Sequence, residues 1–234
     1  FFEELVAVIP PFTLYGAAKR GSMALMKNLG GAALIALIAY TMYLWTGTGQ
    51  QWLFLGVGCY AIFSWATSLK QRDPAAYALI WGNPAFLCTI MGYGCVAFVS
   101  YAASYWGAPY AERVFEVPKT EIGWLIGGPG ALAGFLGVIL GGRMADWLRL
   151  RNASGRILVI AFGLLAPIIP FVAAFSTTSP AYFYVLLFCA HICTASALGA
   201  AAATTQDLVL PRMRGTATAT FFIATTLFGL ALGP

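Results

Sequence analysis

Charge is scarce in this 234-residue sequence: charged residues occupy 9% of the positions, and there is a single histidine. Soluble domains carry charge at about a quarter of their positions, so the composition excludes an ordinary water-soluble domain. The 13 lysines and arginines lie in short turns between apolar runs and form no basic helix face, which excludes a nucleic-acid surface. We therefore expect an integral membrane protein with no nucleic-acid partner.

Motifs for catalysis, metals and cofactors are missing as well. The five cysteines all lie in apolar runs, which favours reduced thiols over a disulfide framework. Cys189 and Cys193 share a helical face, whereas His191 points about 200° away from Cys189, so one helix cannot bring all three to a metal ion. The sequence also contains no recognisable catalytic set or phosphate-binding loop. We expect no metal, no cofactor and no enzymatic activity.

Apolar residues are what the sequence has in quantity, at 60% of its positions. A helix needs roughly 20 mostly apolar residues to cross a bilayer. Suitable runs lie at about 31–45, 52–69, 84–106, 122–140, 157–175, 181–205 and from 213 onward. We therefore expect an all-α integral membrane protein, a helical bundle with about seven transmembrane helices.

The segment before the first of these runs differs from the rest. Residues 1–29 are apolar but are interrupted by Pro10 and Pro11 and by several charges, which is typical of an interfacial or linker segment. We expect two membrane helices in 30–70 and the larger part of the bundle in 71–234. Because the chain lacks an initial Met and ends inside an apolar run, we also expect it to be part of a longer protein.

The turns between the runs alternate in charge. Every second turn is basic, and these turns hold Lys19, Arg20, Lys27, Lys70, Arg72, Arg143, Arg149, Arg151, Arg156, Arg212 and Arg214. The intervening turns have no excess of bases. By the positive-inside rule, the basic turns are expected to be cytoplasmic.

Glycines recur every three or four residues in the run at 122–140. They share one helical face and are Gly123, Gly127, Gly130, Gly134, Gly137 and Gly141. Small residues at this spacing let a neighbouring helix approach closely. Two interpretations stay open: a helix that slides against its partner, or static packing.

Polar side chains inside the runs are the candidates for a substrate cavity. One stripe falls within about 60° on a single helix and consists of Thr89, Tyr93, Ser100 and Ser104. It faces either a cavity or a neighbouring helix that accepts hydrogen bonds. His191 shares a helical face with Tyr184, and it has either a substrate or proton role or a structural one, as a neutral side chain bonded to a carbonyl.

One turn resembles a known motif. Gly142, Arg143 and Asp146, followed by Arg149 and Arg151, are similar to the signature loop that major facilitator superfamily transporters carry after the second helix of each six-helix half. The family has a base directly after the acid, where this sequence has Trp147. The departure affects the charge contacts expected of the loop.

Two later runs resemble a particular branch of that superfamily. Residues 206–214, which contain Gln206, Asp207, Arg212 and Arg214, and residues 229–234 are similar to Spinster-type proteins, including bacterial relatives of the sphingolipid transporters. Together with the signature loop, the resemblance covers about residues 84–234. It implies helices seven to eleven of a twelve-helix transporter, with the N-terminal half absent from this chain. The two earlier helices are then either an inserted pair, which we slightly prefer, or helices five and six.

The resemblance implies a function as well. It predicts a monomeric secondary transporter in the bacterial inner membrane that moves a small organic or lipid-like molecule by alternating access, coupled to protons. The signature loop is expected to act as a cytoplasmic gate, in which Asp146 accepts from a helix N-terminus while Arg149 and Arg151 donate to carboxylates. The alternative is a non-transporting membrane receptor or scaffold with the same fold.

Overall fold

The computed structural model describes residues 6–233, apart from the side chains of residues 230 and 231, and nearly all of this range is helical. Residues 1–5 of the predicted interfacial segment and Pro234 of the Spinster-like run lie outside the described residues. The chain divides into two compact units, Phe1–Asn83 and Pro84–Pro234. We refer to them as the N-terminal and C-terminal units and describe each by itself.

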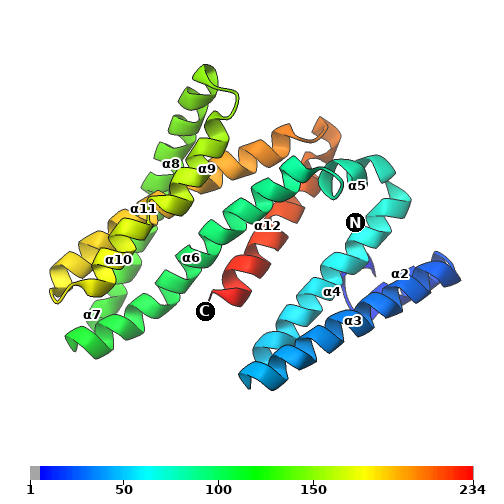
Figure 1. Ribbon diagram of the computed structural model, residues 1–234, viewed down its shortest axis with the longest axis horizontal. Coiled ribbons are helices and arrows are strands. Elements are labelled where there is room, and N and C mark those ends of the chain that lie inside the picture. Colours follow the sequence, from blue (N-terminus) through cyan, green and yellow to red (C-terminus); the bar gives the residue numbers. More distant parts are fainter. Residues whose placement is uncertain (1–5, 234) are drawn as a thin grey trace. The chain divides into compact units, whose positions relative to one another are not determined.

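The N-terminal unit is built on a helical hairpin. Its elements are α2 (Phe12–Lys19), α3 (Ser22–Thr46), α4 (Gly49–Arg72) and α5 (Pro74–Ile80). Helices α3 and α4 run side by side in opposite directions (Figure 1). Gly47 ends α3 with a positive φ of 75°, a left-handed conformation that glycine adopts without strain. The hairpin therefore reverses over a very short turn.

Helix α3 begins at Ser22, so it includes the last residues of the segment 1–29. The polar residue Asn28 within this helix is satisfied by partners inside the unit. Asn28 is fully buried; its Nδ2 donates to Ser64 Oγ at 3.0 Å and its Oδ1 accepts from the Tyr60 hydroxyl at 2.5 Å. That hydroxyl also lies 2.9 Å from Thr13 Oγ1, which fastens α2 to the hairpin.

The connection to the next unit contains the short helix α5. A helix starts with Pro74 at its first position, and Asp73 Oδ1 accepts from the backbone N–H of Ala76 at 3.0 Å. This helix ends at Ile80, and a separate helix begins at Pro84. The first compact unit consequently ends at Asn83, and the second begins at Pro84.

The C-terminal unit contains the rest of the helices. They are α6 (Pro84–Phe115), α7 (Lys119–Ile122), the π-helical turn η1 (Gly123–Gly127), α8 (Gly128–Arg151), α9 (Gly155–Leu165), α10 (Ile168–Ser176), α11 (Pro180–Asp207), the 3₁₀ turn η2 (Pro211–Met213) and α12 (Arg214–Leu232). In the described residues, six helical stretches are long and apolar enough to cross a membrane. The seventh predicted span corresponds to α12.

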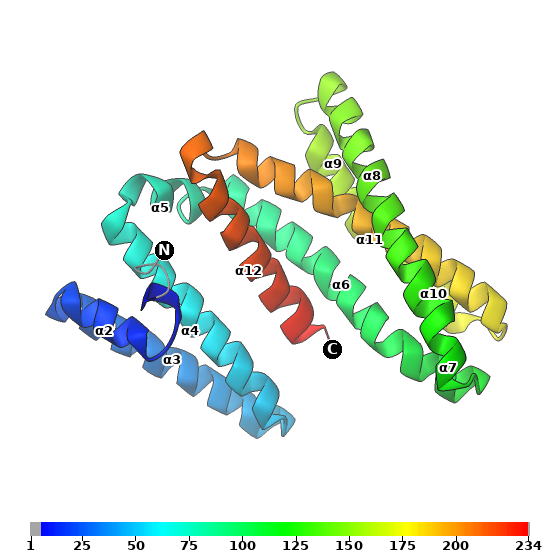
Figure 2. The same ribbon diagram turned by 180° about the vertical axis from the view of Figure 1, so that it is seen from behind.

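Helix α11 is the centre of the C-terminal unit, where it packs against α6, α8, α9 and α10. Helices α6 and α12 lie side by side in both views (Figure 1 and Figure 2). The predicted close approach of α8 is confirmed at Gly137 and Gly141, where a Cβ atom would collide with the backbone of α11. The other predicted positions, from Gly123 to Gly134, face open space.

Candidate functional site

A cavity of about 310 Å³ lies in the C-terminal unit between α6, the start of α8 and α11. We call it the polar cavity. Its polar side chains are Ser104, Tyr184 and His191, three of the six residues that the sequence proposed for a substrate cavity. The apolar wall consists of Leu125, Ile126, Gly127, Pro129, Gly130, Leu187 and Phe188.

The hydrogen bonds of His191 define which nitrogen carries a proton. Its Nδ1 lies 2.8 Å from the carbonyl oxygen of Leu187, and because a carbonyl can only accept, Nδ1 carries a hydrogen. Its Nε2 lies 3.0 Å from Ser104 Oγ, and the same Oγ lies 2.8 Å from the carbonyl oxygen of Ser100. Ser104 has one hydrogen to give, so it cannot donate in both directions at once.

The direction of the Ser104–His191 bond therefore depends on the charge of the imidazole. When His191 is neutral, Nε2 is an acceptor and the Ser104 hydroxyl must donate to it. When His191 is protonated, Nε2–H donates to Ser104 Oγ, and the hydroxyl is released to the carbonyl of Ser100. Rotation of one hydroxyl group thus allows the Ser104–His191 hydrogen bond to form with either charge state of the imidazole.

Tyr184 lies on the same face of α11 as His191 and lines the same cavity. Its hydroxyl group is buried and has no hydrogen-bond partner among the described residues. A buried hydroxyl without a partner costs roughly 1–3 kcal/mol, which a ligand with a polar group can recover. Tyr184 therefore combines a place in the cavity wall with a hydroxyl whose hydrogen-bonding capacity is unused among the described residues.

The other three predicted cavity residues lie elsewhere. Thr89 donates to the carbonyl of Ala85 on its own helix at 2.8 Å. Tyr93 stacks on Phe221 of α12, with ring centroids 5.1 Å apart. Ser100 contributes its carbonyl to Ser104 but does not line the cavity. One end of the stripe on α6 thus faces the cavity, whereas at the other end Thr89 bonds within its own helix and Tyr93 packs against α12.

The sequence analysis did not identify the turn that closes the cavity on the α8 side. η1 is π-helical over Gly123–Gly127, and π turns shift hydrogen bonding from the fourth to the fifth residue along. Pro129 follows immediately and has no N–H to offer the carbonyl four residues earlier, which favours such a shift. The run from Gly127 to Gly130, two glycines, a proline and a glycine, was the available signal.

A network of charged side chains joins three helix ends on the opposite side of the C-terminal unit. Asp207, at the end of α11, accepts from Arg149 of α8 and from Arg156 Nη1 of α9, the latter at 2.5 Å. Arg156 Nη2 also donates to Asp146 Oδ1 at 3.4 Å. We call these four residues the charge network. Arg156, the most enclosed member at 16% side-chain exposure, is the one that sequence reasoning did not select.

The signature loop makes its charge contacts within the C-terminal unit. Among the described residues, Asp146 pairs with Arg156, and the expected contact with a helix N-terminus stays a prediction. Arg149 donates to a carboxylate as expected, but Arg151 stacks on the ring of Trp147 at 4.0 Å. The aromatic residue that replaces the family's base thus binds the arginine that was expected to reach an acid.

The remaining loop residues have simpler surroundings. Arg143, Arg212 and Arg214 are exposed. Gly142 lies opposite Gly199, whose Cβ position is 3.8 Å from the Cα of Gly142. Gln206 Nε2 donates to Thr218 Oγ1 at 3.2 Å and links α11 to α12. Across residues 6–233, no group of three histidine, cysteine or acidic side chains is arranged to hold a metal ion.

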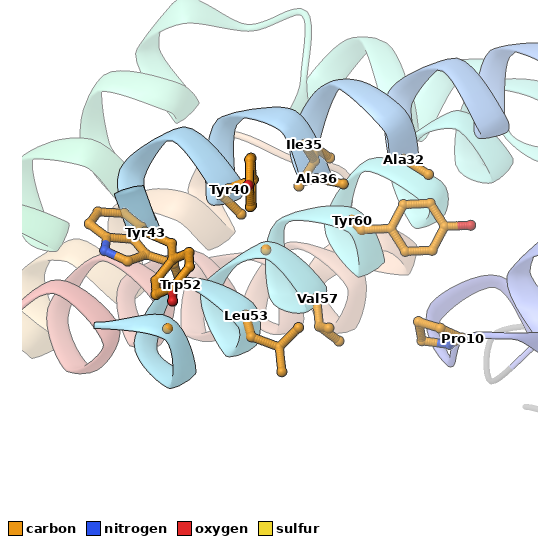
Figure 3. Close-up of a pocket in the computed structure, with 13 residues that line it drawn as sticks. Pro10, Ala32, Ile35, Ala36, Tyr40, Tyr43, Trp52, Leu53, Val57 and Tyr60 are labelled. Atoms are coloured by element: carbon orange, nitrogen blue, oxygen red, sulfur yellow. The ribbon is translucent and has the colours of Figure 1, made fainter. Parts of the chain in front are cut away.

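A larger cavity, of about 480 Å³, lies between α3 and α4 in the N-terminal unit. Figure 3 shows Tyr43 and Trp52 at one end and Tyr60 and Pro10 at the other. Apart from Tyr40, the rest of its wall is aliphatic or glycine, and the lining residues include no acid or base. We call it the apolar cavity; its lining suits hydrocarbon rather than a charged molecule.

No family model matches the sequence. The chain is 29% identical over 184 residues to protein spinster homolog 1 of Xenopus laevis, a match that covers 73% of this chain and 34% of that protein. It is 27% identical over 176 residues to an MFS-type efflux pump of Mycolicibacterium smegmatis, covering 71% of this chain and 41% of the pump. The chain therefore spans less than half the length of these relatives.

Two solved structures share the fold, and both are of a bacterial homologue of the human lysosomal transporter Spinster. The inward-facing, occupied form is 26% identical, with a TM-score of 0.59 over 95% of this chain and 50% of that one. The inward-facing, unoccupied form is 24% identical, with a TM-score of 0.60 over 95% and 51%. The likeness thus includes the N-terminal unit as well as the C-terminal unit.

The apolar helices and this likeness define an integral membrane protein with the fold of the major facilitator superfamily. Within that fold, the relatives of the chain are Spinster proteins and an MFS-type efflux pump. The resemblance to the Spinster-like branch that the sequence predicted is confirmed.

Proposed function

We propose that this chain is the C-terminal part of a proton-coupled secondary transporter, which moves a small organic or amphipathic molecule by alternating access. The observation that carries the proposal is the polar cavity, where His191, Ser104 and Tyr184 meet inside a major facilitator fold. Alternating access requires a site at the interface of two halves that rock against each other. The N-terminal half of the transporter is therefore a required partner of this chain.

The two long helices of the N-terminal unit, α3 and α4, fit this proposal as helices five and six. The structural likeness covers 95% of the chain, so these helices have counterparts in that relative. On this assignment α6 is helix seven, and α8 and α11 are helices eight and ten. The basic ends of the helices then face the cytoplasm by the positive-inside rule.

The proton step follows from the hydrogen bonds of His191. Protonation reverses the bond between Nε2 and Ser104 Oγ, so the charge of the imidazole changes what the cavity wall offers to a substrate. A buried histidine with a hydroxyl partner can therefore couple a proton to substrate binding. Tyr184, with its unpartnered hydroxyl, supplies the polar contact, and the apolar wall accommodates the rest of the molecule.

In this proposal, the charge network keeps the helix ends at the gate rigid relative to one another. Arg149 and Arg156 hold the ends of α8, α9 and α11 through one carboxylate. These helix ends consequently move together when the cytoplasmic side opens or closes. The Trp147–Arg151 pair stays within the signature loop, which leaves Arg143 as an exposed base that can reach the other half.

Uptake into proteoliposomes that contain the full-length transporter tests this proposal. With a panel of labelled amphipathic molecules, we expect accumulation that depends on an imposed pH difference, and His191→Gln should abolish that dependence. Tyr93→Phe is the matched control, because Tyr93 lies on α6 outside the cavity. Unchanged pH dependence in His191→Gln would exclude the proton role. A transporter that accumulates no molecule in the panel would favour a receptor or scaffold instead.

A further inference from the structure

The polar cavity has polar groups at two separate places along its wall. Tyr184 and His191 lie on one face of α11, two helical turns apart, which corresponds to roughly 10 Å along the helix at 1.5 Å per residue. Ser104 of α6 is bonded to His191 and therefore lies at the same end as the histidine. Because all three residues line one cavity, the cavity extends over this distance.

The wall between the two polar ends is apolar. On α11 it consists of Leu187 and Phe188, which lie between Tyr184 and His191 in the sequence, and η1 adds Leu125 and Ile126. Apolar surface of this kind favours hydrocarbon over water or polar groups. The lining thus has a hydrogen-bonding group at each end and an apolar middle.

The volume of the cavity limits the shape of its ligand. A volume of about 310 Å³ over a length of roughly 10 Å gives a mean cross-section of about 30 Å², which is a width of roughly 6 Å. Carbon atoms in contact lie about 3.5–4.0 Å apart. The cavity therefore has room for one hydrocarbon chain but not for two side by side.

The Ser104 end requires a hydrogen-bond donor from the ligand. Both ring nitrogens of His191 are already bonded, Nδ1 to the carbonyl of Leu187 and Nε2 to Ser104 Oγ. Ser104 is exposed to the cavity, and its single hydrogen is given either to His191 or to the carbonyl of Ser100. Because a hydroxyl oxygen has two lone pairs, at least one of them is free in either arrangement and accepts from a ligand.

The Tyr184 end is less restrictive. Its hydroxyl is buried and has no hydrogen-bond partner among the described residues. A phenol hydroxyl both donates and accepts, so a hydroxyl, an amine or a carbonyl group of a ligand can satisfy it. A ligand that reaches from Ser104 to Tyr184 completes the hydrogen bonding at both ends.

We propose that the polar cavity selects single-chain molecules with a hydrogen-bond donor at one end, bound by Ser104, and a second polar group at the other end, bound by Tyr184. The apolar wall holds the chain between these groups. We take the cavity to be the substrate site, so this selectivity rests on the proposed function and names its substrate class. Amphipathic molecules with one polar end satisfy only half of the site.

Binding of small alcohols to the purified full-length transporter tests the proposal. Dissociation constants are measured by saturation-transfer NMR at one fixed pH for octanediol, which has a hydroxyl at each end, and for octanol, which has one. Tyr184→Phe keeps the ring and removes the hydroxyl, and it should weaken octanediol binding about threefold to tenfold, the effect of one neutral hydrogen bond. Octanol should be weakened less than about twofold, because it still binds at Ser104.

Two further measurements control for general effects of the substitution. Tyr182→Phe is the matched control, because Tyr182 is exposed on the same helix and does not line the cavity; it should change neither alcohol. Butanediol with terminal hydroxyls is too short to reach both ends, so Tyr184→Phe should weaken it less than about twofold. Ser104→Ala, at the opposite end, should weaken octanediol about as much as Tyr184→Phe.

Equal weakening of octanediol and octanol in Tyr184→Phe would overturn the two-ended site. So would a Tyr184→Phe variant that melts at a lower temperature but binds octanediol normally, since its hydroxyl would then bond to the protein. These outcomes are independent of the transport assay. Uptake whose pH dependence survives His191→Gln would reject the proton role while leaving diol binding intact, whereas pH-dependent uptake without the diol preference would reject the selectivity alone.

Discussion

Gly141 is the position where the packing of the C-terminal unit can be tested most sharply. A Cβ atom there would lie 2.5 Å from the carbonyl carbon of Ser196 on α11, and closer still to its oxygen. Both are backbone atoms, so no side chain can rotate away to make room. Gly141→Ala therefore forces α8 and α11 apart, or it bends one of them.

The size of the effect follows from this distance. An ordinary Cβ contact begins at about 3.4 Å, so the 2.5 Å distance to the carbonyl carbon alone requires a local separation of about 0.9 Å, and the closer oxygen requires more. Overpacking of this kind costs about 1–3 kcal/mol. For a unit of this size, 1 kcal/mol corresponds to a change in melting temperature of about 2–4 °C. We therefore expect Gly141→Ala to lower the melting temperature by several degrees.

The assay is thermal unfolding of the purified full-length transporter in detergent, followed by tryptophan fluorescence. Gly134→Ala is the matched control, because Gly134 lies on the same helix and a Cβ atom there meets nothing within 4 Å. Removing a glycine from a helix interior should leave the control unchanged or stabilise it by up to about 1 kcal/mol. If both variants melt at the same temperature, α8 does not approach α11 as closely as described.

Two further predictions concern polar contacts. Asn28→Leu should lower the free energy of unfolding by about 1–3 kcal/mol. The reason is that Ser64 Oγ loses its donor and the Tyr60 hydroxyl loses its acceptor. A melting temperature equal to that of the wild type would contradict the buried network. Asp207→Asn should destabilise the protein by about 1 kcal/mol, because this carboxylate pairs with two arginines. Asp146→Asn should destabilise it by less than about 0.5 kcal/mol, because the Asp146 side chain is 74% exposed. Equal losses in the two variants, measured by chemical denaturation, would refute this ranking.

Much of the fold could be predicted from the sequence, because bilayer thickness constrains apolar run lengths strongly. The spans from 84 onward coincide with helices that the structure contains. The start of α3 could not be predicted, since Lys27 and Asn28 interrupt the apolar run. Whether a buried asparagine is tolerated depends on partners more than 30 residues away, and those contacts are set by tertiary packing.

The site could be predicted in part for a related reason. Helical periodicity places Tyr184 and His191 on one face, and the structure brings Ser104 to them from another helix. Periodicity gives the face of α6 on which a residue lies, but it does not give what packs against that face at each level of the helix. Thr89 and Tyr93 were therefore grouped with residues that face a cavity. Arg156 was counted only as a base in a turn, because its two carboxylate partners come from different helices.

The π-helical turn η1 has a consequence for how sequences of this kind can vary. A π turn contains one residue more than the α-helical turn that would replace it. Deleting any one residue of Gly123–Gly127 would convert the π turn to a regular α-helical turn and leave the flanking helical segments in register. The change would be confined to the turn, where Leu125 and Ile126 line the cavity, and His191 would stay in place. A single-residue deletion here would therefore reshape one wall of the cavity without displacing α8.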